Sequence, residues 1–380
     1  MKIAIDISQI VHEGSGVATY TDHLVRNLLK VDKQNEYILF GISFRKFHKL
    51  QDYFSELKLL SENLRSNFFH IPPKVGEFVW NKMHLLNIEN LIDDVDIFHS
   101  SDWIQIPSRA KKITTIHDLL VLEYPEVSHP YIVEVQKRRL KWVQKECDTV
   151  LTDSIFTKDQ VNKILHIDSS RIEIVYPGIS EKFKPAHEES KKFIKQKYGL
   201  YDDYILSVGT LEPRKNIKAV LDAFEKFMKH QLISTRKKPI ELVIVGKTGW
   251  GEKINKTKYI HPLGYVPEKD LPSLYSAASL FVYPSLYEGF GFPVLEAMAC
   301  NCPVITSDRG SLKEITSDAA LIIDPLVSED IAVKMTQVFV DGDLRENLIL
   351  KGKKNAERYN WEKTAMEVLN IYKKLVNHKL

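Results

Sequence analysis

The sequence predicts an α/β protein of two domains, each a parallel sheet with helices on both faces. Three observations support this fold class. The chain of 380 residues is long enough for two domains of ordinary size. Short β-branched runs alternate with amphipathic helical segments along its whole length. In each half, the first strand leads through a short turn into an amphipathic helix, as in Rossmann-like nucleotide-binding units.

The predicted strands are apolar runs without an alternating polar face, which is typical of strands buried between two helix layers. In the first half they are residues 2–7, 37–41, 68–71, 96–100, 113–117, 149–152 and 172–175. In the second half they are residues 204–208, 242–245, 261–265, 280–283, 303–306 and 320–323. Apolar residues at helical spacing predict the two leading helices over 17–31 and 216–232.

Prolines and a glycine interrupt the chain at residues 176–185, so the domain boundary is placed there. The expected domains are residues 1–178 and 179–361. The last segment, residues 362–380, is amphipathic and must pack on one of them.

Composition excludes several classes of protein. The 53 basic and 50 acidic residues are too balanced to indicate a nucleic-acid partner. Three cysteines without a framework point to a reducing compartment. No signal peptide and no membrane-spanning run is visible, so we expect a cytoplasmic protein, with peripheral contact at the inner face of a membrane left open.

The strongest candidate site is the stretch YEGFGFPVLEAMACNCPVI at residues 287–305. It follows an apolar strand, and Gly289 and Gly291 allow a tight turn. Pro293 is expected at the first position of the helix that follows, which places Glu296 in its first turn. Such a helix start favours an anion such as a diphosphate. Glu288 and Glu296 would repel phosphate but accept hydrogen bonds from sugar hydroxyls, which together suits a nucleotide sugar. The alternative is a glycine turn with Glu296 placed in the first helical turn by the helix dipole alone.

A second candidate is SVGTLEPRKNI at residues 207–217, where Arg214 and Lys215 follow a strand and precede a helix. Two cations at the carboxyl end of a strand match a diphosphate leaving group. The alternative is a solvated basic turn that ends with Asn216 as the cap of the helix.

Two further candidates lie in the first half. Gly14 and Gly16 leave room for a phosphate or sugar, or simply form a tight turn. They are not the G-x-G-x-x-G dinucleotide fingerprint, because Thr19 stands at its last glycine. His117 lies at the carboxyl end of the strand at 113–117, where it would face a ligand. A structural role is equally consistent with this position.

Several other patterns are judged to be structural. The D-x-D strings at 94–96 and 341–343 lie at a strand's amino end and between helices, and Cys300 and Cys302 lack further ligands, so no metal site is predicted. The basic stretch 137–145, which includes Trp142, is interpreted as a solvated helix face. Contact with a membrane or an anionic acceptor is the alternative.

Taken together and in order, these elements resemble the retaining glycosyltransferases of family 4, which have the GT-B fold. The E-x7-E motif is met by Glu288 and Glu296, and the basic pair by Arg214 and Lys215 in GTLEPRKNI. The phrases LTDSIFTKDQV, VYPGI, LGYVP and the carboxyl-terminal WEKTA are similar to the family's phrases as well. The resemblance covers nearly the whole chain. Asn301 and the GSG loop depart from the family's usual glycines, and only the detailed contacts of the loop are affected.

The resemblance implies two Rossmann-like domains with a cleft between them and a final helix that crosses back to the first. It also implies site residues, whose catalytic members are His117, Arg214, Lys215 and Glu288. Arg214 and Lys215 would bind the diphosphate, Glu288 the donor sugar, Glu296 the ribose, and His117 the sugar near its anomeric carbon. The other implied substrate-binding residues are Gly14, Gly16, Gly264, Tyr265, Val266, Gly289, Phe290, Gly291, Phe292 and Leu295.

The implied activity is transfer of a hexose from a nucleotide-diphosphate sugar to a hydroxyl of a glycan, glycolipid or lipid-linked acceptor, with retained anomeric configuration and without a metal or other cofactor. GDP-mannose is the first choice of donor, and cell-surface polysaccharide or glycoconjugate synthesis the expected setting. The alternatives are a UDP-sugar-dependent transferase, a UDP-sugar 2-epimerase of the same fold, and an inactive nucleotide-sugar-binding partner subunit.

Overall fold

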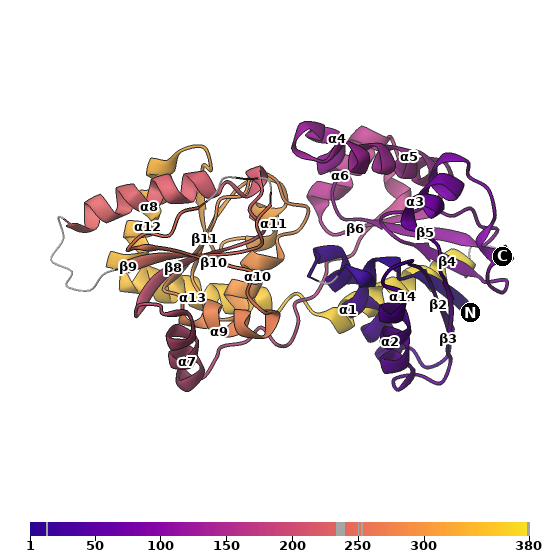
Figure 1. Ribbon diagram of the computed structural model, residues 1–380, viewed down its shortest axis with the longest axis horizontal. Helices are drawn as coiled ribbons and strands as arrows, with labels where there is room; N and C mark the ends of the chain where they lie inside the picture. Colours follow the sequence, from indigo (N-terminus) through magenta and orange to yellow (C-terminus); the bar gives the residue numbers. More distant parts are fainter. Residues whose placement is uncertain (13, 233–239, 250, 252–253, 378–380) are drawn as a thin grey trace. The chain divides into compact units, whose positions relative to one another are not determined.

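The computed structural model describes residues 1–12, 14–232, 240–249, 251 and 254–377. It divides into two compact units, Met1–Gly178 with Asn360–Leu380, and Ile179–Tyr359 (Figure 1). The first division lies at the expected position, and the second lies two residues before the expected one. Each unit is a parallel sheet between helices, the α/β class that the apolar runs predict. None of the described helices is long and apolar enough to cross a membrane.

The described part of the first unit forms a seven-stranded parallel sheet in the order β3-β2-β1-β4-β5-β6-β7. Its strands are β1 (Lys2–Asp6), β2 (Glu36–Ile42), β3 (Leu64–Phe69), β4 (Ile97–Ser100), β5 (Lys111–Ile116), β6 (Thr149–Thr152) and β7 (Ile172–Ile174). Ile3 of β1 lies opposite Tyr37 on one side and Ile97 on the other, so β1 and β4 are neighbours although far apart in sequence.

Helices cover both faces of this sheet. They are α1 (Gly16–Val31), α2 (Phe47–Lys58), α3 (Pro73–Gly76), α4 (Leu120–Glu123), α5 (Pro130–Glu146), α6 (Ile155–Leu165) and α14 (Trp361–Asn377), with a π-helical turn at Glu77–Lys82. Local chemistry sets several starts: Ser15 and Ser154 cap α1 and α6 by accepting a backbone N–H, and Pro130 opens α5. Figure 1 shows α14 beside α1, so the final helix returns to the first unit as expected.

The described part of the second unit repeats the pattern, with six parallel strands in the order β10-β9-β8-β11-β12-β13. The strands are β8 (Asp203–Val208), β9 (Ile240–Val245), β10 (Ile260–Gly264), β11 (Leu280–Tyr283), β12 (Val304–Ser307) and β13 (Leu321–Ile323). The helices are α7 (Glu188–Tyr198), α8 (Ile217–Leu232), α9 (Leu271–Ala277), α10 (Phe292–Ala299), α11 (Leu312–Thr316), α12 (Ser328–Val340) and α13 (Gly342–Ala356). The buried faces of α8 and α12 form one apolar core with the strands.

Each strand predicted from an apolar run is present, but one is displaced. The strand expected at 68–71 is β3, Leu64–Phe69. β3 is the edge strand of its sheet, and only Leu64 is fully buried. A half-exposed edge strand tolerates polar residues such as Arg65 and Asn67, so its sequence carries no continuous apolar run. The helix predicted from residue 216 starts at Ile217, because Asn216 has a left-handed backbone with φ 55°.

The return of the chain to the first unit depends on Gly178. A Cβ at this position would collide with the backbone of Asn360 and Trp361, where α14 begins. The Trp361 ring in turn packs against Tyr20 and His23 of α1. Backbone cannot move aside as a side chain can, so the glycine is required for this docking.

We therefore expect Gly178→Ala to destabilise the protein by about 2–4 kcal/mol, since it overpacks a site bounded by backbone. Gly342→Ala is the matched control, because a Cβ there meets nothing within 4 Å. Urea unfolding followed by tryptophan fluorescence measures both. Equal stability of the two variants would contradict this role of Gly178.

Candidate active site

The strand order of the second unit reverses between β8 and β11, which are neighbours in the sheet. In open parallel sheets, ligands bind outside the carboxyl ends of the strands at this switch point. The loop after β8 carries Arg214 and Lys215, and the loop after β11 carries Glu288. These are the residues predicted from sequence, and the two loops meet here: Arg214 Nη1 lies 2.8 Å and Lys215 Nζ 2.6 Å from Glu288 Oε1.

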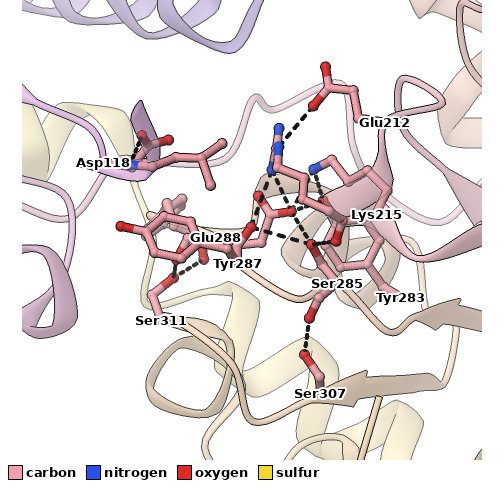
Figure 2. A network of polar contacts seen from close by, with 12 residues as sticks. Asp118, Glu212, Lys215, Tyr283, Ser285, Tyr287, Glu288, Ser307 and Ser311 are labelled. Carbon is pink, nitrogen blue, oxygen red and sulfur yellow. Dashed lines mark hydrogen bonds and ion pairs between the residues drawn. The ribbon is translucent and has the colours of Figure 1, made fainter. Parts of the chain in front are cut away.

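The Glu288 carboxylate is the centre of a larger network (Figure 2). The Ser285 hydroxyl donates to Oε1 at 2.6 Å, and the Tyr283 hydroxyl donates to it at 2.9 Å. Lys215 also donates to the Tyr283 hydroxyl. One carboxylate oxygen thus receives two cations and two hydroxyls, which fixes the position of the carboxylate in a buried environment.

Burial and charge act in opposite directions on this network. Burial alone would raise the pKa of Glu288, but the charges of Arg214 and Lys215 outweigh it and lower the pKa to about 2. Burial lowers the pKa of Lys215, against the opposing effect of Glu288. The side chain of Arg214 is 23% exposed and those of Lys215 and Glu288 are each 9% exposed. Arg214 is therefore the more exposed of the two cations.

The end of β12 and the loop that follows it contact the loop that carries Glu288. Ser311 donates its backbone N–H to the Glu288 carbonyl at 3.0 Å and its hydroxyl to the Phe290 carbonyl at 2.8 Å. A Cβ on Gly310 would collide with the Glu288 backbone. Ser307 donates to the Ser285 carbonyl at 2.5 Å. Sequence reasoning missed these residues, because nothing in the local pattern links positions about 20 residues apart.

Glycines also lie at the carboxyl ends of the strands on one side of this switch point. Gly209 and Gly246, after β8 and β9, have φ values of 154° and 158°, and a Cβ on Gly246 would collide with the Gly209 carbonyl. Gly264, at the end of β10, has φ 66° and accepts the Gly246 N–H at 2.9 Å. Tyr265 beside it is 63% exposed, whereas Val266 is buried. Of the residues predicted here, Tyr265 therefore has an exposed side chain and Val266 does not.

Helix α10 follows the glycine turn, with two corrections. Gly291 is its N-cap with φ 106°, so Phe292 is the first helical residue and Pro293 the second, not the first. Glu296 is consequently in the second turn, where the helix dipole has little effect on it. Instead, the Tyr275 hydroxyl donates to Glu296 Oε2 at 3.0 Å. Burial raises the pKa of Glu296 to about 7, despite that hydrogen bond.

Some predicted contacts must be made by backbone. The side chains of Leu295 and Phe290 are buried, and Phe290 packs edge-on against Phe292 and Tyr359. Neither the Phe290 ring nor the Leu295 side chain can reach a ligand unless this packing is broken. Gly289 lies between Glu288 and Phe290 in this loop, so it is positioned by the same anchors.

In the first unit, the glycine loop differs from a simple turn. A short 3-10 helix at Ser8–Val11 follows β1, Gly14 has φ 76°, and Gly16 is the first residue of α1 rather than part of the turn. No atom lies within 4 Å of a Cβ built on Gly16, among the described residues. The space that the sequence suggested at this helix start is therefore present.

His117 lies just after β5, as predicted, and has a partner that sequence reasoning missed. Its Nδ1 is 2.7 Å from Oδ2 of Asp153, a buried residue just after β6. Burial alone would lower the pKa of His117, but Asp153, with smaller effects from Asp102 and Asp118, raises it. The Tyr20 ring packs edge-on against the imidazole at 4.6 Å. Asp153 thus keeps a proton on Nδ1 of the imidazole. Nε2 is then the ring nitrogen that can contact other groups.

The patterns judged structural have ordinary partners. Asp96 accepts the Lys2 N–H, Asp94 pairs with Arg109, and Asp341 caps α13. Cys300 and Cys302 are buried, and no group of three His, Cys, Asp or Glu side chains among the described residues could hold a metal.

Replacing Glu288 with Gln removes the carboxylate that compensates two cations. We expect Glu288→Gln to lower the free energy of unfolding by about 3–5 kcal/mol, as in other broken buried pairs. Glu329→Gln is the matched control, because Glu329 pairs with Lys226 at the surface and should cost less than about 1 kcal/mol. Chemical unfolding measures both.

The lowered pKa of Glu288 adds a pH dependence. Its contribution is present in full above the ordinary pKa of 4.5 and is lost as the pH falls toward about 2. The wild-type protein should therefore lose more stability over that interval than Glu288→Gln does. Parallel acid-unfolding curves for the two proteins would contradict the assigned pairing.

For His117, we expect Asp153→Asn to lower the imidazole pKa below 6.5, because burial remains when the carboxylate is lost. In the wild type, the pair stabilises the fold in full below pH 6.5, and this contribution is lost as the pH rises through the raised pKa of His117. NMR titration of the imidazole signals, assigned with His117→Gln, measures the shift. Asp159→Asn, at an exposed position on α6, should leave the pKa unchanged.

Known proteins share this architecture and sequence. Residues 14–183 match the family model Glycosyltransferase Family 4, and residues 190–355 match Glycosyl transferases group 1. O-antigen chain mannosyltransferase B of Escherichia coli is 30% identical over 99% of this chain and 100% of its own length. O-antigen chain mannosyltransferase RfbU of Salmonella typhimurium is 30% identical over 58% of each chain.

Solved structures agree on the fold. Sucrose-phosphate synthase from Thermosynechococcus elongatus superposes with a TM-score of 0.75 over 100% of both chains at 18% identity. WaaG, a glycosyltransferase involved in lipopolysaccharide biosynthesis, superposes with a TM-score of 0.68 over 98% of this chain and 99% of its own, at 14% identity. The two Rossmann-like units are thus of the GT-B type, and the chain belongs to the glycosyltransferases of family 4.

Proposed function

We propose that the enzyme transfers mannose from GDP-mannose to a hydroxyl of a growing glycan, in the synthesis of a cell-surface polysaccharide, with retention of anomeric configuration. The observation that carries this proposal is the meeting of Arg214, Lys215 and Glu288 at the switch point of the second unit. The choice of sugar and setting rests on the relatives, two of which are O-antigen chain mannosyltransferases.

The donor's diphosphate would lie against Arg214 and the amino-terminal end of α10. Arg214 is held from two sides, by Glu212 at 2.8 Å from Nε and by Glu288 at 2.8 Å from Nη1, so its guanidinium is oriented before the donor arrives. Lys215 is more deeply buried, and its positive charge adds to that of Arg214. Preorganised charges of this kind stabilise a leaving phosphate without rearrangement during the reaction.

The sugars of the donor would meet the two glutamates. Glu288 has a pKa near 2 and stays ionised, so it can accept hydrogen bonds from hydroxyls of the transferred hexose. Glu296, with a pKa raised to about 7, is held by Tyr275 where the family pattern assigns the ribose. Near neutral pH, Glu296 can therefore either accept or donate a hydrogen bond.

For retention, we propose attack on the same face as the leaving group. The bond between the anomeric carbon and the diphosphate oxygen breaks, the bond to the acceptor oxygen forms, and the departing phosphate oxygen takes the acceptor's proton. His117, with its Nδ1 proton fixed by Asp153, would hold the donor sugar near the anomeric carbon through Nε2. The Arg214 guanidinium and the amino-terminal end of α10 would stabilise the charge on the leaving diphosphate, and the proposed reaction uses no metal ion.

The alternatives make different products. A UDP-sugar donor would leave the chemistry unchanged and alter only the base and sugar contacts. A 2-epimerase would convert the nucleotide sugar without an acceptor, and an inactive binding subunit would convert nothing. HepE of Anabaena, which shares the fold at 14% identity, was crystallised with UDP and glucose, so a UDP-sugar donor is compatible with the fold. Incubation with each donor, with and without an acceptor glycan, separates these cases.

The acceptor would be a glycan, a glycolipid or a lipid-linked glycan. A lipid-linked acceptor would bring the enzyme to a membrane surface from the cytoplasmic side, so peripheral membrane contact is part of the proposal.

Arg214→Ala should reduce kcat/KM for the donor by the equivalent of about 2–4 kcal/mol, the loss expected for one preorganised charge donor. Arg358→Ala, which removes an exposed arginine after α13, is the control and should leave kcat/KM unchanged. Thermal unfolding of both variants separates lost chemistry from lost structure. Near-normal turnover of a folded Arg214→Ala enzyme would remove Arg214 from the site.

The stereochemical claim has its own test. NMR of the first-formed product should show the anomeric configuration of the donor, and turnover should be unaffected by excess EDTA. An inverted product, or activity that EDTA abolishes and divalent metal restores, would contradict the proposed mechanism.

A further inference from the structure

An unusual surface lies in the first unit at residues 73–86, which we name the interfacial surface. It consists of α3, the π-helical turn Glu77–Lys82 and the four residues that follow. Its exposed residues are Pro73, Lys74, Val75, Phe78, Lys82, Met83, Leu85 and Leu86. The large apolar side chains among them are 44–57% exposed. Glu77, the one acidic residue of the segment, is buried and paired with Arg138 of α5 at 2.6 Å.

The exposed side chains lie on a segment whose buried residues are fixed by hydrogen bonds and ring stacking. The buried Trp80 donates its indole N–H to the Leu86 carbonyl at 3.1 Å, and Asn81 hydrogen-bonds both Trp103 and Gln105. His84 stacks on Trp142 of α5 with ring centroids 3.6 Å apart. The surface is therefore presented by a fixed scaffold.

The backbone supports the same conclusion. His84 and Leu86 adopt left-handed conformations, with φ values of 52° and 65°, although neither is glycine. Such a backbone conformation is strained for a residue other than glycine and persists only where surrounding contacts impose it. The strained backbone of this loop coincides with the exposure of Leu85 and Leu86. A turn with only a structural role does not require exposed leucines.

The exposed charges around the apolar side chains are mostly positive. Lys82 lies over the Phe78 ring at 5.5 Å, and Lys74 lies over the ring of Tyr131, on the adjacent α5, at 5.8 Å. The exposed lysines of α5 are Lys137, Lys141 and Lys145, and Glu134 is the exposed acid of that helix. Lysines beside exposed rings and leucines match the boundary of a bilayer, where stems lie along apolar surface and ammonium groups reach lipid phosphates.

We propose that the interfacial surface docks the first unit on an anionic lipid bilayer, with the α5 lysines beside it. Apolar side chains enter the headgroup region and lysines contact anionic headgroups, without a membrane span. This deepens the proposed function, since it names where the enzyme meets the membrane of a lipid-linked acceptor. It keeps the lysines of the stretch 137–145, for which membrane contact was the sequence alternative, and gives Trp142 a different role. Trp142 donates to the Asn81 carbonyl at 2.8 Å and stacks on His84, so its ring supports the interfacial surface from within the unit.

The test is flotation of the purified full chain with vesicles of phosphatidylcholine alone or with about 30 mol% phosphatidylglycerol. We expect binding to the anionic vesicles only, weakened at high salt because headgroup attraction is screened. Phe78→Ser with Leu85→Ser should lower the partition coefficient about tenfold or more. Lys74→Gln with Lys82→Gln should lower it by roughly fivefold for each lysine.

Leu59→Ser with Leu326→Ser is the matched control, since both leucines are exposed elsewhere, and it should bind as the wild type does. Transfer to a soluble acceptor should be equal for all these proteins, so failure of docking is distinguishable from failure of the proposed function. Equal flotation of the surface variants and the control would overturn the proposal. So would a dimer, in sedimentation velocity, that Phe78→Ser with Leu85→Ser converts to monomer, because the surface would then bind a second copy of the chain.

Discussion

The site depends on one buried carboxylate. Glu288 receives Arg214, Lys215, Tyr283 and Ser285 on a single oxygen, and each of these groups is fixed because the carboxylate is there. Without it, the two neighbouring cations would repel each other, and burial would favour loss of the lysine's proton. A site for a diphosphate must be positive and yet stable when empty. In the proposed donor site, Glu288 compensates the buried cations, while the Arg214 side chain stays 23% exposed.

The fold supplies the location of this carboxylate. Both units are doubly wound parallel sheets, and in each the first strand and the fourth are neighbours, so loops distant in sequence meet at one edge. In the second unit, glycines at the ends of β8 and β9 let backbone approach closely, and the loop after β12 presses the Glu288 loop into place through Gly310 and Ser311. The first unit uses the same strand ends differently, since Asp153 after β6 orients His117 after β5.

Much of this was predictable from sequence, and the parts that were not share a physical cause. Apolar runs and turn residues are local, so the strands, the two leading helices and the loops that carry Arg214, Lys215, Glu288 and His117 could be placed. The edge strand β3 was displaced because its exposure weakens the apolar pattern. Ser285, Ser311, Gly310 and Asp153 were missed because their roles depend on which loops meet. Trp142 was assigned to a solvated face because helical spacing does not show that the segment at 77–84 covers it.

The most direct test of the account is the thermal shift of the purified protein with GDP, UDP, ADP and their common sugar derivatives, for the wild type and Arg214→Ala. A ligand at about 100 times its Kd stabilises a protein by about 2.7 kcal/mol, which is several degrees. The account predicts a shift with one nucleotide family, largest with one sugar and strongly reduced in Arg214→Ala. No shift with any nucleotide, or a shift that Arg214→Ala leaves unchanged, would contradict the claim that the Glu288 network forms the donor site.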